Sequence, residues 1–540
     1  MSEVDNVQAA THVTACITPP PLLIALPGGL YVSGVVTWAV QLANALVAAG
    51  GRAGLLVHAL RAGYAPASPV IDARVRLFDL SELGDFEQGT IDLDGCREAY
   101  AHAVLELRGC DEGPVVVSPN LHGDCYGVCA SLTLNDNICG QVRLLGWCHL
   151  DSSYDLRMLS YFAPVLSRVA AVSSRLHTLL AAELSGHEVT VDEVAYGVRL
   201  RSGPPIESLT GSPPRIIYSG RMDQTVKRVG ILPALSLELA RRGIRHELML
   251  VGDGPENHAM DSAIQIMKQR RHDDCRDNDY IMTRRGATPE CQLGELLASS
   301  ELFVLPSTAE GLSLSMLEAM GAGCIPVVTA VRSGPAQVIT HNVNGYLVEA
   351  GDTAQNITSA FADVVAEHLR RPAADRAAMR ESARSAAAVY SMSAHVARVR
   401  VLLEQAVRGQ PKRWPQSRPW GFTSNAVVGP GGATRLVEAL KRLTTHGASV
   451  AIYGAGNHTL QLKHIFEPYL DRIACFADDS PRSNQLLGRP LVALKDVASH
   501  RVSSLIVSSC IHAEQMYQNA HRSLPGLQIV TLYDQSVVAA

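Results

Sequence analysis

The sequence predicts an α/β protein of three units, each built around a parallel β-sheet with helices on its faces. Short apolar runs alternate with helical patterns along the chain, which is typical of parallel sheets. The length of 540 residues exceeds what one hydrophobic core holds, because domains usually have about 100–200 residues. Hydrophobic residues make up 47% of the chain and the net charge is −5, so we expect a globular protein without the basic surface that a nucleic-acid partner requires.

The first unit is predicted to span residues 1–205 and to contain one doubly wound sheet. Its predicted strands are Leu22–Leu26, Gly54–His58, Pro114–Ser118, Val142–His149, Val169–Ser173 and Glu193–Val198. A glycine-rich turn with Gly28, Gly29 and Gly34 follows the first strand. Such a turn lets backbone N–H groups approach a phosphate, although a purely structural turn explains these glycines equally well on their own.

A second series of apolar runs begins after the Pro-containing segment Gly203–Pro214 and defines the second unit, residues 206–408. Its predicted strands are Arg215–Ser219, Glu247–Gly252, Tyr280–Thr283, Leu302–Pro306 and Ile325–Thr329. The predicted helices that end this unit are Thr353–Arg370, Ala373–Val389 and Ser393–Val407. Alternation of strands with helices again predicts a parallel sheet.

The segment Arg408–Gly421 has three Pro and two Trp and shows no periodicity. It predicts a linker, placed at residues 409–430, or a chain laid across a surface. The third unit follows at residues 431–540. Its predicted elements are the helices Ala433–His446 and Ala513–Arg522 and the strands Ser449–Tyr453, Arg472–Ala477, Ser504–Ser508 and Gln528–Leu532.

The twelve Cys residues are scattered without the spacing of a zinc site, so we expect free thiols in the reducing cytoplasm. No apolar run approaches the ~20 residues that a membrane-spanning helix needs. Two Asp-x-Asp triplets, Asp92–Asp94 and Asp277–Asp279, lie in polar stretches rather than at the ends of strands. We interpret both as solvated turn acids, and the sequence therefore predicts no metal ligand.

Two glutamates, Glu310 and Glu318, flank the start of a nearly all-apolar helix in the second unit. An ionised carboxylate in apolar surroundings costs several kcal/mol, so Glu318 is expected to face a polar ligand or a cation. The preceding helix N-terminus offers free N–H groups and the positive end of a dipole, which suit a phosphate or a polar sugar. Glu310 alone is equally explained as a favourable helix N-terminal charge.

A loop with Gly220, Arg221 and Lys227 follows the first strand of the second unit. Ligands of open α/β sheets bind at this end of the strands. Arg221, with its planar fork, and Lys227, as a point charge, suit the two phosphates of a diphosphate. Taken alone, the fragment is also compatible with a solvated basic loop.

The order of these motifs gives a more specific result. From Arg215 to Val407 the chain resembles the nucleotide-binding domain of retaining glycosyltransferases with the GT-B fold, whose mark is two Glu residues with seven between them. The resemblance extends through Ser333–Ile339 and Asn342–Val348. It implies two Rossmann-like doubly wound domains that face a cleft, with the third, C-terminal Rossmann-like domain appended.

The family's site residues can be carried over by position. The resemblance implies that Arg221 and Lys227 neutralise the donor diphosphate and that Glu318 accepts hydrogen bonds from the ribose. Glu310 would hold the donor sugar and the distal phosphate together with the backbone N–H groups of the loop that follows. These donor-binding loop residues are Gly311, Leu312, Ser313 and Leu314.

In the first unit, the resemblance places the glycine-rich turn opposite the donor diphosphate. It also implies that His149, at the end of a predicted strand, contacts the donor sugar, whereas a satisfied core histidine is the alternative. Tyr196 stands where the family usually has Asn, which puts contacts near the interdomain hinge in doubt.

The resemblance implies a cytoplasmic glycosyltransferase of the hexosyl or related class that uses a nucleotide-diphosphate sugar, a UDP- or GDP-sugar first of all. The expected route is front-face substitution without a metal or other required cofactor, because two cationic side chains do the work of a divalent ion. The acceptor is a glycan, a lipid-linked molecule or a small molecule. A lipid-linked acceptor would bring the protein into peripheral contact with the cytoplasmic membrane face.

The third unit has a glycine-rich turn between a strand and a helix, which is the layout of a nucleotide-binding fold. Its candidate residues are Gly454, Gly456, His458 and Asp478. Thr459 replaces the third glycine of the dinucleotide pattern. The unit resembles the Rossmann-like nucleotide-sugar domains attached to some sugar acyltransferases and methyltransferases.

Two alternatives to a glycosyltransferase stay open: a noncatalytic protein that binds a nucleotide sugar, and a nucleotide-dependent activity in this third unit.

Overall fold

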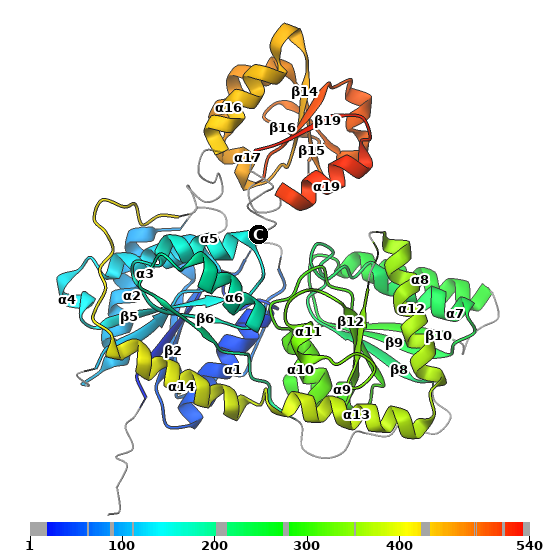
Figure 1. Ribbon diagram of the computed structural model, residues 1–540, viewed down its shortest axis with the longest axis horizontal. Helices are drawn as coiled ribbons and strands as arrows, with labels where there is room; N and C mark the ends of the chain where they lie inside the picture. Colours follow the sequence, from blue (N-terminus) through cyan, green and yellow to red (C-terminus); the bar gives the residue numbers. More distant parts are fainter. Residues whose placement is uncertain are drawn as a thin grey trace, which may run out of the picture.

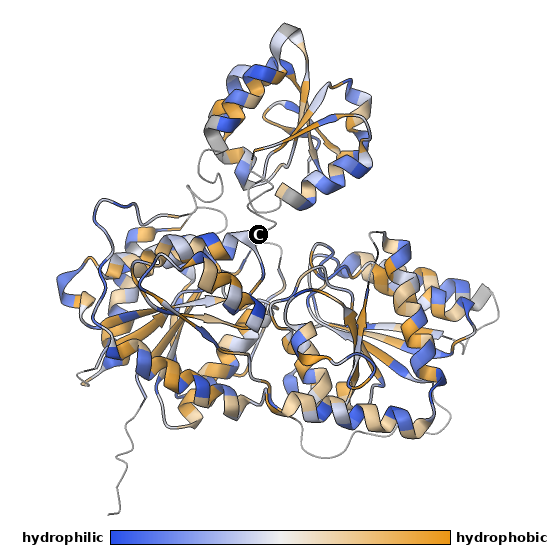
Figure 2. Ribbon diagram, in the orientation of Figure 1, coloured by the Kyte–Doolittle hydropathy of each residue, from blue (hydrophilic) through white to orange (hydrophobic). Residues whose placement is uncertain are grey.

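The computed structural model describes residues 19–61, 64–86, 91–110, 113–200, 213–273, 280–349, 351, 353–422, 432–479, 481, 483–509 and 513–532. These residues form three sheets with helices packed on their faces (Figure 1). The apolar residues concentrate on the strands and on the inner faces of the helices (Figure 2). The predicted α/β architecture is therefore confirmed.

The first domain has a seven-stranded parallel sheet in the order β3-β2-β1-β4-β5-β6-β7. Its strands are β1 (Leu22–Leu26), β2 (Ala53–His58), β3 (Arg76–Leu80), β4 (Val115–Ser118), β5 (Val142–Cys148), β6 (Leu166–Ala171) and β7 (Thr190–Glu193). Its helices are α1 (Gly34–Ala48), α2 (Leu93–Arg108), α3 (Gly123–Leu132), α4 (Asp136–Cys139), α5 (Ser153–Phe162) and α6 (Ser174–Glu183).

Three strands of this sheet differ from the prediction by more than one residue. Strand β3 was not predicted, because it lies at the sheet edge, three of its five side chains are exposed, and charged residues interrupt its apolar ones. Strand β6 begins three residues earlier than predicted, and β7 ends at Glu193, where the predicted strand begins. The buried run from Val194 to Val198 follows β7 as irregular chain rather than as a strand.

The second domain has a six-stranded parallel sheet in the order β10-β9-β8-β11-β12-β13. Its strands are β8 (Arg215–Ser219), β9 (His246–Val251), β10 (Tyr280–Arg285), β11 (Leu302–Leu305), β12 (Ile325–Thr329) and β13 (Tyr346–Val348). Its helices are α7 (Ile231–Arg241), α8 (Asn257–Asp273), α9 (Glu290–Ala298), α10 (Leu314–Gly321), α11 (Pro335–Val338), α12 (Ala354–Arg370) and α13 (Ala373–Ala388). The strand order reverses between β8 and β11, and ligands of such sheets bind at this point.

The chain returns to the first domain after α13. Helix α14 (Met392–Arg408) packs on α1, β4, β5 and β6, and the crossing is fixed where Met392 N donates to Val198 O at 2.9 Å. Residues 409–422, which we call the strap, then lie across the first domain. Trp414 in the strap is 2% exposed, and its backbone N–H donates to Thr133 Oγ1 at 2.9 Å. This part of the predicted linker is a chain laid across a surface.

The third domain has a six-stranded sheet in the order β16-β17-β15-β14-β18-β19, parallel except for the β16–β17 pair. Its strands are β14 (Val450–Tyr453), β15 (Ile473–Asp478), β16 (Gln485–Leu486), β17 (Arg489–Ala493), β18 (Ser504–Val507) and β19 (Gln528–Thr531). Its helices are α16 (Gly432–Leu443), α17 (Asn457–Gln461), α18 (Lys463–Phe466) and α19 (Ala513–Ser523). Within the described ranges, no helix combines the length and the apolar character needed to cross a membrane.

Candidate active site

The loop after β8 is held by backbone contacts that leave no room for side chains. Gly252, in the turn after β9, has φ of 130°, and a Cβ on it would lie 2.0 Å from Gly220 O. A Cβ on Gly254 would lie 2.4 Å from Met222 O. The two turns therefore pack backbone to backbone, which only glycine permits. This contact fixes the backbone position from which the Arg221 side chain extends.

Lys227 and Glu310 form a close ion pair. Lys227 Nζ donates to Glu310 Oε1 at 2.6 Å, and the two side chains are 18% and 9% exposed. The sequence predicted separate roles for these residues, and the structure joins them directly. A pair this well shielded is costly to break, because the remaining charge stays buried without a partner.

Arg228 holds this loop against the end of β11, and the sequence analysis did not single it out. Its backbone is left-handed, with φ of 50°. Its guanidinium donates to Pro306 O at 2.6 Å and to Ser307 O at 2.8 Å. Burial lowers the pKa of Arg228. Of these two adjacent cations, Arg228 is a structural anchor, whereas Lys227 pairs with Glu310.

The loop from Glu310 to Ser313 leads into α10, where the Ser313 side chain accepts a hydrogen bond from Met316 N at 3.3 Å. Within the described part of the chain, the backbone N–H groups of Gly311, Leu312, Ser313 and Leu314 donate no hydrogen bond. They lie at the positive end of the α10 dipole, beside the Lys227–Glu310 pair. This arrangement suits an anion or a polar sugar.

Gly311 also makes a close contact between the two domains. A Cβ on Gly311 would lie 1.9 Å from the carbonyl oxygen of His149, at the end of β5. Ser333 Oγ donates to Gly311 O at 3.1 Å and lies 3.2 Å from Ser173 Oγ of the first domain. This loop of the second domain is therefore seated directly on the carboxyl edge of the first sheet.

Glu318 lies on α10 and is partly exposed. Burial raises its pKa to about 7, and the charge of Glu290 adds to the shift, whereas a hydrogen bond from the Gln41 side chain opposes it. Gln41 belongs to α1, so the side chain that favours the charged form of Glu318 comes from the first domain. The predicted contact with a ribose stays a prediction.

Arg221 points to the first domain. Its Nε lies 3.5 Å from Asp223 Oδ2, and its guanidinium carbon lies 5.5 Å from the centre of the Tyr64 ring. The Tyr218 hydroxyl donates to Arg221 O at 2.6 Å, which fixes the backbone at this residue. Arg221 and Lys227 thus share one loop at the point where the strand order reverses.

His149 is 6% exposed, and both of its ring nitrogens are hydrogen-bonded. The Asn120 amide nitrogen donates to Ala25 O, so its Oδ1 accepts from His149 Nε2 at 3.0 Å. The Tyr196 hydroxyl then donates to His149 Nδ1 at 2.6 Å. Burial lowers the pKa of His149 to about 3, which keeps the ring neutral.

This network explains why a tyrosine suits position 196, where its hydroxyl reaches the imidazole. The predicted contact between His149 and a donor sugar stays a prediction, and it requires that one of these two hydrogen bonds be exchanged. In the present arrangement, the backbone carbonyl of His149 contacts Gly311.

The glycine-rich turn of the first domain lies close to the start of α10. Gly29 has φ of 70°, and a Cβ there would lie 2.7 Å from His58 O, so this position requires glycine. Arg61 N donates to Gly28 O at 2.9 Å. A Cβ on Gly34 would make an ordinary contact of 3.8 Å with Leu314, so α1 begins close to the start of α10.

The candidate residues of the third domain gather at the end of β14. Gly454 has φ of 118°, and a Cβ on it would lie 2.6 Å from Ser508 O. His458 Nδ1 lies 2.9 Å from Ser508 Oγ, and Ala455 N donates to Asp478 Oδ2 at 3.2 Å. Gly456 is exposed and precedes α17, which has only five residues. A nucleotide site here stays a prediction.

Only one of the two Asp-x-Asp triplets lies within the described residues. Asp92 caps α2 by accepting from Gly95 N at 3.0 Å, and Asp94 pairs with Arg97 at 3.2 Å. The second triplet, Asp277–Asp279, lies outside the described residues. Among the residues that the structure covers, no three His, Cys, Asp or Glu side chains are grouped so as to hold a metal ion.

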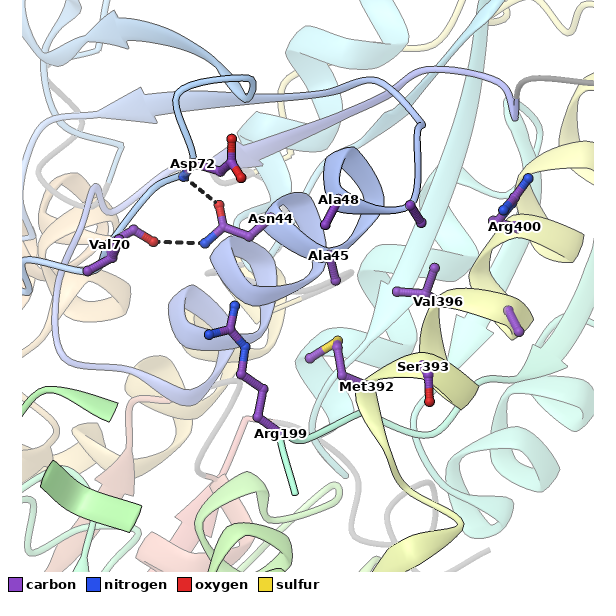
Figure 3. A pocket seen from close by; sticks show the side chains of 12 residues that line it. Asn44, Ala45, Ala48, Val70, Asp72, Arg199, Met392, Ser393, Val396 and Arg400 are labelled. Carbon is purple, nitrogen blue, oxygen red and sulfur yellow. Dashed lines mark hydrogen bonds between the residues drawn. The ribbon is translucent and has the colours of Figure 1, made fainter. Parts of the chain in front are cut away.

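A cavity of about 700 Å³ lies between α1 and α14, away from these residues (Figure 3). Small side chains such as Ala45 and Val396 form its walls, and the guanidinium groups of Arg199 and Arg400 lie at its edge. The Asn44 side chain closes one side by donating to Val70 O at 2.8 Å. None of the predicted donor-binding residues lines this cavity.

Two solved structures share the fold of the first two domains. A Staphylococcus aureus TarM structure, in complex with fondaparinux, α-GlcNAc-glycerol and UDP, gives a TM-score of 0.54 at 12% identity and covers 71% of this chain and 99% of its own. The pneumococcal O-GlcNAc transferase GtfA, in complex with UDP and GlcNAc, gives 0.53 at 12% identity and covers 72% of this chain and 100% of its own. These likenesses confirm the GT-B fold.

Curated relatives match over shorter segments. N-acetyl-α-D-glucosaminyl L-malate synthase of Bacillus anthracis is 34% identical over 131 residues, which are 24% of this chain and 31% of the relative. 2-Deoxystreptamine N-acetyl-D-glucosaminyltransferase of Niallia circulans is 29% identical over 159 residues, which are 29% of this chain and 38% of the relative. The chain thus spans about a third of the length of these relatives.

The family model described as glycosyl transferases group 1 matches residues 213–367. This range holds the loop of Arg221 and Lys227, the Glu310 loop and helix α10. The second domain is thus similar to the glycosyl transferases group 1 family, and it is set in a GT-B fold with a third α/β domain at the C-terminal end.

Proposed function

We propose that the protein is a retaining glycosyltransferase that moves a sugar from a nucleotide-diphosphate sugar to an acceptor hydroxyl. The observation that carries the proposal is the Lys227–Glu310 pair at 2.6 Å, beside the unused N–H groups that start α10. Both lie where the strand order of the second sheet reverses, which is where open parallel sheets bind ligands. The group 1 family match to this domain supports the same function.

The donor diphosphate would be held by charges from one loop. Arg221 and Lys227 would neutralise its two phosphates, and the amides from Gly311 to Leu314 would donate to the distal phosphate and the sugar. Because Lys227 is already paired with Glu310, donor binding would share this cation between the carboxylate and a phosphate oxygen. Glu310 would keep the ammonium group in place while the donor enters.

In the chemical step, the bond between the anomeric carbon and the diphosphate breaks, and the diphosphate leaves with the bonding electron pair. The acceptor oxygen forms its bond on the same face of the sugar, and its proton passes to the leaving phosphate oxygen. Arg221, Lys227 and the loop amides stabilise the charge that develops on the leaving group. A double displacement needs two carboxyl groups flanking the bond, whereas Glu310 is engaged with Lys227, so we favour front-face substitution.

We favour a UDP-sugar as the donor, because the solved TarM and GtfA structures of this fold both contain UDP. The acceptor class is proposed as a glycan, a lipid-linked molecule or a small molecule. The reaction would take place in the cytoplasm, where nucleotide sugars are used, and at its membrane face if the acceptor is lipid-linked. Two cationic side chains would make a divalent ion unnecessary for charge neutralisation.

The test is a panel of UDP-, GDP-, ADP- and TDP-glucose, measured for binding and for slow donor hydrolysis in buffer with EDTA. Wild-type protein and Lys227→Ala are compared, with Lys268→Ala, on the exposed face of α8, as the matched control. We expect one donor to be bound and hydrolysed, with hydrolysis lost in Lys227→Ala and kept in the control. Binding of a donor without hydrolysis or transfer in the wild type would favour a noncatalytic binding protein instead.

A further inference from the structure

The chain segment after β2 is attached to the glycine-rich turn of the first domain. Arg61 N donates to Gly28 O at 2.9 Å, and Ala67 N donates to Leu30 O at 2.9 Å. A Cβ on Gly28 would also lie 3.4 Å from Arg61 Cβ, so the two backbones are in close contact. Arg61 and Ala67 therefore keep a fixed position beside the glycine turn.

Tyr64, on this segment, has two guanidinium groups from different domains within cation–π distance of its ring. The Arg61 guanidinium carbon lies 4.6 Å from the ring centre, and that of Arg221, from the second domain, lies 5.5 Å from it. Tyr31 packs against the same ring edge to face, with centres 5.3 Å apart. Tyr31 is 3% exposed, so the tyrosine that supports the ring is itself fixed in the core.

This contact holds Arg221 without using its hydrogen-bond donors. An aromatic face attracts a cation through its quadrupole and leaves the N–H groups at the rim of the guanidinium pointing away from the ring. Within the described residues, the Arg221 guanidinium donates no hydrogen bond, and its Nε is buried 3.5 Å from Asp223 Oδ2. The side chain is oriented by a partner that leaves its planar fork available for a phosphate.

We propose that Tyr64 is a positioning residue of the donor site, which orients the Arg221 guanidinium toward the diphosphate from across the domain boundary. This inference rests on the proposed function, because it assigns the diphosphate as the anion that Arg221 meets. It also gives the first domain a part in donor binding. Arg221 has its binding orientation only when the segment that carries Tyr64 is seated against the second domain.

The test is calorimetric titration of the full chain with UDP, in wild type and in Tyr64→Leu, Tyr64→Phe, Arg221→Ala and the double variant Tyr64→Leu/Arg221→Ala. We expect Tyr64→Leu to weaken UDP binding about threefold to tenfold, because a cation–π contact that is partly shielded from water has this size. Tyr64→Phe keeps the ring and is expected to restore most of the affinity. In the Arg221→Ala background, Tyr64→Leu is expected to have no further effect.

The matched control is Tyr161→Leu, which removes another cation–π contact, with Arg418 at 4.2 Å, outside the donor site. It should leave UDP affinity at the wild-type value. Equal losses from Tyr64→Leu with and without Arg221, or a Tyr64→Phe variant as weak as Tyr64→Leu at unchanged melting temperature, would overturn the inference alone. Wild-type protein that binds none of UDP, GDP, ADP and TDP would overturn the proposed function together with the inference.

Discussion

Replacing Gly311 by Ala should disable sugar transfer while leaving the second domain folded. The added Cβ would lie 1.9 Å from the His149 carbonyl oxygen, and carbon atoms essentially never approach closer than 3.0 Å, so the donor loop and the end of β5 must separate by about 1.1 Å. The Cβ is attached directly to the backbone and the carbonyl oxygen belongs to it, so no side-chain rotation can relieve the contact. A displacement of about 1 Å in a positioned group costs on the order of 10²-fold in rate.

The assay is steady-state transfer with the donor found in the nucleotide panel, alongside UDP titration and thermal unfolding. We expect kcat to fall about 10²-fold, because the loop amides no longer meet the leaving group in the seated arrangement. Gly294→Ala is the control, since a Cβ there meets nothing within 4 Å and the position lies inside α9. That variant should keep full activity and gain up to about 1 kcal/mol of stability. A Gly311→Ala protein with wild-type kcat would refute the reasoning, because the donor loop would then not depend on its contact with His149.

Three further predictions follow from the described contacts. Lys227→Met should abolish transfer and lower the free energy of unfolding by about 3–5 kcal/mol, because Glu310 would stay buried without its partner; adding Glu310→Gln should recover stability in urea unfolding without recovering transfer. Burial raises the pKa of Glu318 from 4.5 to about 7, so the folded state binds more protons than the unfolded state between these values, and stability should fall as pH rises through that range. Glu318→Gln should flatten this part of the pH dependence when melting temperatures are measured from pH 5 to 8, and an unchanged slope would contradict the assignment. Trp414→Ala should cost about 3–5 kcal/mol in urea unfolding, because the strap would lose its most buried side chain; a loss below 1 kcal/mol would mean that the strap contributes little to the first domain.

Much of the fold could be predicted because the central strands are apolar runs with clear ends. β1 and β8 were predicted with the bounds that the structure has, since both are short apolar runs in the middle of a parallel sheet. The edge strand β3 was missed for the opposite reason, because it is mostly exposed and two of its five residues, Arg76 and Asp79, are charged. Strand β13 was missed because it has only three residues.

The candidate site could be predicted in its residues but not in its contacts. Arg221, Lys227 and Glu310 were identified from motifs, whereas the 2.6 Å bond between Lys227 and Glu310 joins residues far apart in the chain. The contact of Tyr64 with Arg221 links different domains, and no local pattern records such a pairing. The sequence showed Tyr196 only as a departure from the family pattern. Its hydrogen bond to His149 can be seen only from the three-dimensional positions of the two residues.

The strap fixes the last described residues before the third domain to the first domain. Its last described residue, Phe422, donates its backbone N–H to Asp124 Oδ1 at 2.6 Å, and its ring occupies the space beside Gly123, where a Cβ would lie 1.9 Å from it. The chain has by then crossed back from the second domain at the Val198–Ser391 bridge. A rotation of the second domain about that crossing would therefore leave the end of the strap, which precedes the third domain in the chain, at rest on the first domain.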